Sequence, residues 1–167
     1  MPRMNNPTTQ RVYVDMMVDT LKRKEEILTF LYSKTKEQEI LLKEEELNQE
    51  EFNKLVQEKG ERIEQLEQMD EGFDRLFKQV EKEITTNREV YRKQIQTMQK
   101  IIASVGELGM KIQALEHQNS ERFKIYLSTQ RKSIRDFHRN NRTASTYYKN
   151  MASAQGAGQS HFFNQQK

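Results

Sequence analysis

The stretch from Leu47 to Ile84 begins with a helix start signal and continues with an apolar stripe of a single helical period. Asn48 can accept a hydrogen bond from a free backbone amide of the first turn, and Glu51 follows three residues on, as in a capping box. Apolar side chains then recur at alternating spacings of four and three residues, which places them on one helix face. They are Phe52, Val56, Ile63, Leu66, Phe73, Phe77, Val80 and Ile84. Because such a helix cannot bury its apolar face alone, it requires another helix as a partner.

Lys59 and Asp70 occupy two positions of the same stripe. A charged side chain on an apolar seam needs a specific partner, whereas a long uniform coiled coil repeats apolar residues at such positions. The two residues therefore favour pairing with other helices of the same chain. A structural coiled-coil protein, with stripes that pair between chains, is the alternative from a different class.

The composition fits long helices that meet along narrow seams. Only 34% of the 167 residues are hydrophobic and 32% are charged, a balance too polar for a thick globular core. We therefore predict an all-α fold, an elongated antiparallel helical hairpin or bundle of three to four long helices. The longest apolar runs span only a few residues, so we expect no membrane insertion.

Start signals and short connections divide the chain into helices. A connection of about two residues before residue 49 makes the first two helices antiparallel neighbours. The second helix outruns its partner near residue 86, where Thr86 and Glu89 form another capping box, so we expect a break at 85–87. A straight continuation is the competing interpretation, because the apolar residues that follow keep the earlier phase.

These signals predict one helical domain at 9–152, between a disordered leader at 1–8 and a flexible tail at 153–167. The tail is rich in small and polar residues and lacks any period. Within the domain we expect helices at 9–46, 49–84 and 88–151. Gly106 and Gly109 fall inside the third helix and mark either a kink or a close approach of two helices.

No pattern of residues predicts catalysis. The three histidines, His117, His138 and His161, lack metal-ligand spacing, and the chain has no cysteine to join them. Carboxylates are plentiful, but on exposed helices no pocket adapts them for acid or base chemistry. We therefore expect neither an enzyme nor a cofactor or metal site.

The charges are distributed unevenly along the chain. Residues 37–71 include 13 acidic and 4 basic residues (net −9), whereas residues 120–167 include 2 acidic and 9 basic ones (net +7). The basic end could bind nucleic acid through the phosphate backbone. No nucleic-acid-binding motif accompanies the charge, so we favour a basic end that rests against the acidic segment or against an acidic partner.

A sparser and more aromatic stripe follows Leu115. The apolar residues before it are expected to fill the seam of the bundle, whereas too little chain follows the later ones to cover them. Flexible methionine and aromatic side chains suit grooves that accept helices of varied sequence. We predict a partner-binding surface made of Phe123, Tyr126, Leu127, Ile134, Phe137, Tyr148 and Met151.

Characteristic stretches run through the whole chain. They are KEEILTFLYSKTKEQ and LNQEEFNKLVQEKGERIEQLEQMDEGFDRLF in the first two helices, MKIQALEHQN in the third, and SIRDFHRNNRTASTYYKNM and SHFFNQQK near the end. Together they resemble the flagellar export chaperones of the FlgN type, in their clostridial form. The similarity covers nearly the whole chain and is most specific in the C-terminal stretches.

This resemblance implies a small cytoplasmic helical protein that binds hook-filament junction subunits and delivers them to the flagellar type III export gate. The family binds its clients through the C-terminal helix, which here implies Phe123, Tyr126, Leu127, Ile134, Phe137, Tyr147, Tyr148 and Met151. Tyrosines of this region are also linked to docking on the export gate, which implicates Tyr147 and Tyr148. A related chaperone for the filament cap or the filament subunit is the alternative within the same class.

Overall fold

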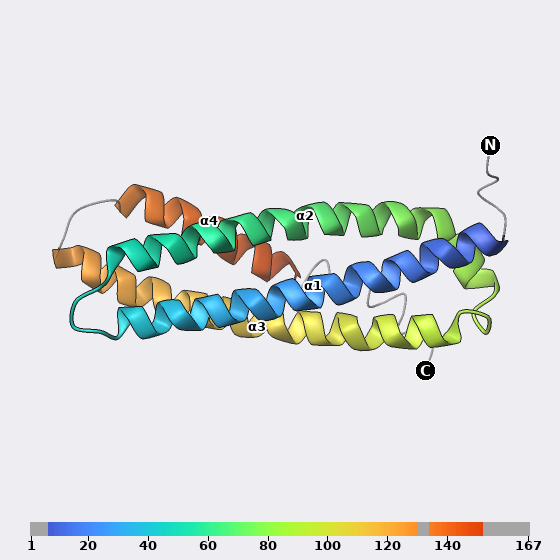
Figure 1. The fold of residues 1–167 in the computed structure, drawn as a ribbon, viewed down its shortest axis with the longest axis horizontal. Coiled ribbons are helices and arrows are strands. Elements are labelled where there is room, and N and C mark those ends of the chain that lie inside the picture. The colour runs from blue at the N-terminus through green and yellow to red at the C-terminus, as the bar shows by residue number, and fades with distance from the viewer. Residues whose placement is uncertain (1–6, 130–133, 152–167) are drawn as a thin grey trace.

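The computed structural model describes residues 7–129 and 134–151, with side chains for 8–128 and 142–151. The described residues form four helices: α1 (Pro7–Leu42), α2 (Gln49–Thr86), α3 (Arg92–Thr129) and α4 (Ile134–Asn150). Figure 1 shows α1, α2 and α3 side by side along one long axis, with α4 returning over one end of the bundle. The predicted all-α elongated bundle is thus confirmed.

The connection between α1 and α2 is longer than expected, because α1 ends at Leu42 and not at Glu46. The amides of Lys43 and Glu44 still bond to carbonyls of the last turn, to Glu39 at 3.1 Å and to Leu41 at 3.3 Å. Three consecutive glutamates follow, and their charge is unfavourable at the negative end of a helix dipole. They therefore lie in the turn and not in another turn of helix.

Asn48 caps α2 as predicted. Its side-chain oxygen accepts a hydrogen bond from the amide of Glu51 at 3.2 Å. At the other end of α2, Asn87 is the C-cap, and its amide bonds to the carbonyl of Glu83 at 2.9 Å. A break between the second and third helices is confirmed, and the straight continuation is wrong. The break lies at 87–91, so Thr86 is the last residue of α2 and the predicted capping box of Thr86 and Glu89 is wrong. The third helix begins at Arg92, after a short turn.

The predicted third helix at 88–151 is in fact two helices, α3 and α4. With 38 residues, α3 is about 57 Å long, close to the length of α1 beside which it runs. Beyond Thr129, α1 offers no further surface to cover an apolar face, so α4 turns back toward the bundle (Figure 1). The residues that join the two helices, 130–133, lie outside the described part of the chain.

Gly109 is a point of close helix approach and not a kink. The helix α3 continues through both Gly106 and Gly109. A methyl group added at Gly109 would lie 2.5 Å from Met151 Cε, whereas one added at Gly106 would meet nothing within 4 Å. The absence of a side chain at Gly109 therefore lets the C-terminal end of α4 settle against α3.

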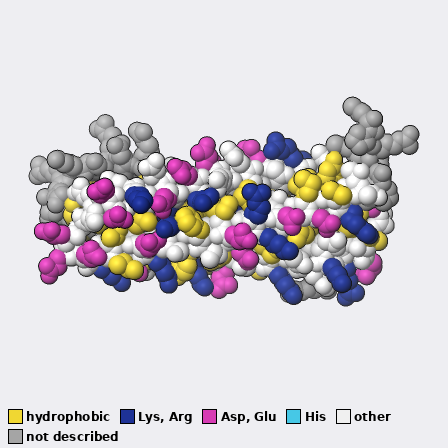
Figure 2. Space-filling view, in the orientation of Figure 1, with side chains coloured by type: hydrophobic (Ala, Val, Ile, Leu, Met, Phe, Trp, Pro, Cys, Tyr) yellow, Lys and Arg dark blue, Asp and Glu magenta, His cyan; other side chains and the backbone are white. Residues whose placement is uncertain are grey.

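The core runs along α1, which packs against both α2 and α3. Fully buried side chains come from all four helices. Most apolar residues before Leu115 fill the seam as expected, but Met16 and Met110 are exposed. The largest fully buried side chains are Met17, Leu28, Leu31, Leu66, Phe73, Ile84, Tyr91, Ile95, Met98, Ile112 and Tyr148. On the face shown in Figure 2, apolar side chains form separate small patches between charged ones.

The first helix begins earlier than predicted. The helix α1 already begins at Pro7, so the last two residues of the predicted leader are helical, and residues 1–6 lie outside the described part. The predicted flexible tail, 153–167, also lies outside it. None of the described helices combines the length and the apolar character that crossing a membrane requires.

Replacing Asn48 by alanine should lower the free energy of unfolding by about 1 kcal/mol, because the amide of Glu51 loses its acceptor. Asn48→Asp keeps the acceptor and should stay close to the parent protein. Urea unfolding followed by far-UV circular dichroism measures both variants. Equal stability of Asn48→Ala and Asn48→Asp would contradict a stabilising cap.

Candidate functional site

The helix α4 lies in the groove between α2 and α3. These two helices both pack along α1 and meet each other through side chains while their backbones stay apart, and α4 packs on α3 and more lightly on α2. The inward face of α4 includes Ala144 and Tyr148, and Met151 follows the helix directly; the three are 7%, 0% and 2% exposed. Thr146 and Lys149 on the other face are exposed. A helix of 17 residues with one apolar face thus occupies a groove whose walls belong to two other helices.

Four of the eight predicted partner-binding side chains are buried inside the chain: Phe123, Leu127, Tyr148 and Met151. The expectation that too little chain remains to cover the late aromatic residues is therefore wrong for these four. Tyr126 and Tyr147 are half-buried. The side chains of Ile134 and Phe137 lie outside those that the structure describes. A role of any of the eight in binding a partner stays a prediction.

Phe123, Tyr126 and Leu127 gather at the end of the bundle where α1 turns into α2. The ring of Phe123 stacks on Phe52, with 5.0 Å between centroids and 4° between the ring planes. The side-chain nitrogen Nε2 of Gln49 donates a hydrogen bond to the hydroxyl of Tyr126 at 2.6 Å. These contacts attach the end of α3 to the beginning of α2 and close the groove at this end.

Tyr147 attaches α4 to the charged stripe position Asp70. Its hydroxyl donates a hydrogen bond to Asp70 Oδ2 at 3.1 Å, and Lys24 Nζ donates to Asp70 Oδ1 at 2.5 Å. One carboxylate thereby joins α1, α2 and α4. Burial raises the pKa of the Tyr147 phenol, and the nearby Asp70 carboxylate raises it further. The phenol therefore remains a hydrogen-bond donor.

Tyr148 is fully buried, and its ring packs edge-on against that of Tyr147 at 5.7 Å between centroids. Its hydroxyl has no hydrogen-bond partner among the described residues. Burial raises the pKa of this phenol as well. A buried donor without an acceptor opposes burial, so the groove holds α4 less well at this position than its apolar contacts alone would allow.

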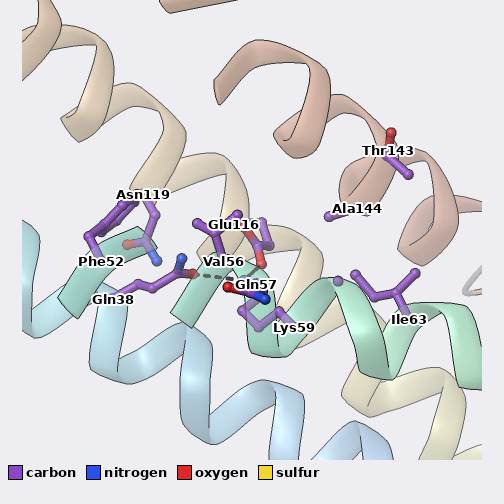
Figure 3. Close-up of a pocket in the computed structure, with 11 residues that line it drawn as sticks. Gln38, Phe52, Val56, Gln57, Lys59, Ile63, Glu116, Asn119, Thr143 and Ala144 are labelled. Atoms are coloured by element: carbon purple, nitrogen blue, oxygen red, sulfur yellow. Dashed lines mark hydrogen bonds and ion pairs between the residues drawn. The ribbon is translucent and has the colours of Figure 1, made fainter. Parts of the chain in front are cut away.

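Lys59 belongs to a second buried polar cluster, in which it contacts Glu116 and donates a hydrogen bond to Gln38 Oε1 at 2.7 Å (Figure 3). The Thr35 hydroxyl lies 3.3 Å from Glu116 Oε1, and Asn119 Nδ2 donates to the Thr35 carbonyl at 3.0 Å. Burial lowers the pKa of Lys59 from 10.5 to about 7, while the adjacent carboxylate favours the charged form. The cluster connects α1, α2 and α3.

Both charged positions of the predicted stripe thus have intramolecular partners, as their placement indicated. The other members of the Lys59 cluster were missed, although they also interrupt apolar spacing. Glu116 and Asn119 continue the alternating spacing of four and three residues between Ile112 and Phe123. Polar residues in phase with an apolar stripe were the signal that could have identified them.

The described part of α4 lies beside the acidic segment of α2. Glu67, Asp70, Glu71 and Asp74 of α2 line a surface pocket together with residues of α4, among them Arg142. Nearby on α3, Arg122 forms an ion pair with Glu39 of α1 at 3.4 Å. Charge attraction across the groove therefore favours α4 in its observed place. Within the described residues, no group of three acidic, histidine or cysteine side chains could hold a metal ion.

The Lys59 and Glu116 pair should behave as one unit in stability measurements. Lys59→Met leaves a buried carboxylate without its cation and should lower the free energy of unfolding by roughly 3–5 kcal/mol. The double variant with Glu116→Leu removes both charges and should recover most of that loss. Urea unfolding of the two single variants and the double variant gives the coupling. Losses that simply add would show that the two charges do not depend on each other.

Replacement by phenylalanine should affect the attachment of α4 differently at Tyr147 and at Tyr148. Tyr147→Phe removes the hydrogen bond to Asp70 and should weaken the attachment of α4 by about 1 kcal/mol. Tyr148→Phe removes a hydroxyl without a partner and should leave that attachment unchanged or strengthen it. Amide hydrogen exchange in residues 142–151 reports local opening. Faster exchange in Tyr148→Phe than in Tyr147→Phe would contradict the assignment.

Comparisons with protein-family models, with curated proteins and with solved structures found no match to this chain. Its function must therefore be inferred from the geometry of the groove, from the helix that occupies it and from the resemblance in sequence described above.

Proposed function

We propose that this protein is a flagellar type III export chaperone that binds the amphipathic helical ends of hook-filament junction subunits before export. The observation that carries the proposal is the groove between α2 and α3, which is filled by an amphipathic helix. A groove that accepts one such helix has the shape and the apolar lining that another requires. The resemblance to FlgN-type chaperones supplies the class of client.

The contacts that hold α4 in the groove are weak enough for another helix to replace it. The helix is short, with 17 residues, and packs mainly through one face. An isolated helix of this length is marginal in water, so its order depends on contacts with the groove. The Tyr148 hydroxyl without a partner weakens those contacts. A client helix that fits the same walls can therefore compete with α4.

Burial of two predicted partner-binding residues determines when they can contact a client. Tyr148 and Met151 are covered by the groove, so they can contact a client only after α4 leaves it. We therefore place the client helix in the groove, with α4 displaced and its apolar face free to add to the complex. Protection of an amphipathic client needs no chemical step, because exclusion of water from its apolar face is sufficient.

The proposed location and the proposed contact with the export gate follow from the resemblance to FlgN-type chaperones. We place the protein in the cytoplasm, where its clients are made, and keep Tyr147 and Tyr148 as candidates for contact with the export gate. A chaperone for the filament cap or the filament subunit would use the same groove. A structural coiled coil has less support, because Lys59 and Asp70 find their partners within the chain.

Size-exclusion chromatography with light scattering, on the full chain mixed separately with each flagellar axial subunit, tests the client. We expect a stoichiometric complex with a junction subunit. A complex with only the cap or the filament subunit would move the proposal to the alternative client. No complex with any subunit, together with self-association, would favour the structural coiled coil.

Displacement of α4 should strengthen client binding. Gly109→Leu places a side chain where Met151 now lies, whereas Gly106→Leu on the same helix meets open space and serves as the matched control. If α4 competes for the groove, Gly109→Leu should lower the apparent Kd several-fold, because a larger fraction of the protein is open. Isothermal titration calorimetry measures both. Equal affinities of the two variants would contradict competition by α4.

A further inference from the structure

The helix α4 fills the groove incompletely at Ala144. A cavity of about 400 Å³ lies between α2, α3 and this part of α4 (Figure 3). Val56, Gly60 and Ile63 of α2 line it together with Ala144, and Gly60 is exposed, so the cavity opens to the outside. Alanine contributes a single methyl group to this wall. A larger apolar side chain at the same position would bury more apolar surface in the cavity.

Tyr148 is the second place where α4 fits the groove incompletely. It follows Ala144 by four residues, so the two side chains lie on the same face of the helix. Its ring is fully buried, but its hydroxyl has no hydrogen-bond partner among the described residues. A phenylalanine would make the same ring contacts without burying a donor that lacks an acceptor.

Charge on the rim of the groove adds a third requirement. Glu67, Asp70 and Asp74 of α2 line a surface pocket together with Arg142 of α4. Arg142 lies two residues before Ala144 and is exposed. Carboxylates attract a basic side chain at this position and repel an acidic one. A helix that takes the place of α4 is therefore favoured by a basic residue there.

We propose that α4 is an imperfect copy of the partner helix, which corrects the two mismatches of α4. The partner carries a large aliphatic side chain where α4 has Ala144, a ring without a hydroxyl where it has Tyr148, and a basic residue where it has Arg142. The aliphatic side chain enters the cavity beside Val56 and Ile63. Such a helix binds the groove more tightly than α4 does and can displace it. Its origin in a flagellar subunit rests on the proposed function, whereas the pattern rests on the groove.

The fit is tested first within the chain itself. Ala144→Leu should slow amide hydrogen exchange in residues 142–151 about tenfold, because the added carbons leave water for the cavity. Leucine has a slightly lower helix propensity than alanine, so this gain cannot come from the helix alone. Thr146→Leu places the same side chain on the exposed face of α4 and should slow exchange by no more than about twofold. Equal effects of the two variants would overturn the proposal.

Gly60 and Gly72 show where the new side chain lies. Both are on α2, and a methyl group added at either meets no atom within 4 Å, but Gly60 lines the cavity and Gly72 does not. Gly60→Leu fills the cavity from α2, so Ala144→Leu should bring no further gain in that background. Gly72→Leu should leave the gain intact. A gain that survives Gly60→Leu would overturn entry into the cavity.

A synthetic peptide with the sequence of residues 134–151 represents the partner helix in trans. Fluorescence anisotropy measures its binding to the full chain carrying Tyr148→Ala, in which α4 has lost its ring contacts. With Ala144→Leu and Tyr148→Phe, the peptide should bind about tenfold more tightly than the unchanged peptide. Adding Arg142→Glu should weaken binding several-fold. Equal affinities of the changed and unchanged peptides would contradict the pattern.

Binding of flagellar subunits to the full chain separates the pattern from the identity of the client. Ala144→Leu tightens α4 in the groove and should weaken binding of a junction subunit several-fold. If a subunit binds but Ala144→Leu leaves its affinity unchanged, the pattern is rejected and the chaperone proposal stands. If the peptides bind in the expected order but no flagellar subunit binds, the pattern stands and the chaperone proposal is rejected.

Discussion

Burial of α1 against two helices at once is the constraint on which the rest of the structure depends. Because α1 packs along both α2 and α3, those helices are held on its flanks with their backbones apart from each other. The groove that results exposes apolar surface, which a chain of this composition cannot leave uncovered without cost. The position of α4 follows from that groove.

Buried polar groups determine how the helices are aligned. Asp70 joins Lys24 of α1 to Tyr147 of α4, and Lys59 joins Gln38 of α1 to Glu116 of α3. Buried charges add little net stability, since removal from water opposes their attraction. A shift of one helix turn would separate each of them from its partner. Their contribution is therefore to select one register among several that the apolar stripes would allow.

The groove matches the apolar face of α4 but leaves some polar groups without partners. The apolar face of α4 is well covered, and acidic side chains of α2 line a surface pocket together with its Arg142. The Tyr148 hydroxyl and the Asn119 carbonyl oxygen nevertheless remain without partners among the described residues. Such local mismatches lower the stability of one element relative to the rest. The Tyr148 hydroxyl lies on α4 itself, so its lack of a partner weakens the attachment of that helix.

The sequence by itself determined the helical class, the cap at Asn48, the existence of a break after α2 and the need of Lys59 and Asp70 for partners. These features depend on local hydrogen bonding and on the period of apolar residues, which are written in neighbouring positions. Only the tertiary structure decided that the chain turns back after Thr129 and that Phe123, Leu127, Tyr148 and Met151 are covered. A periodic stripe states that a face must be buried, but it does not state against what. That choice depends on the length of α1 and on the groove between α2 and α3, which exist only once the bundle has formed.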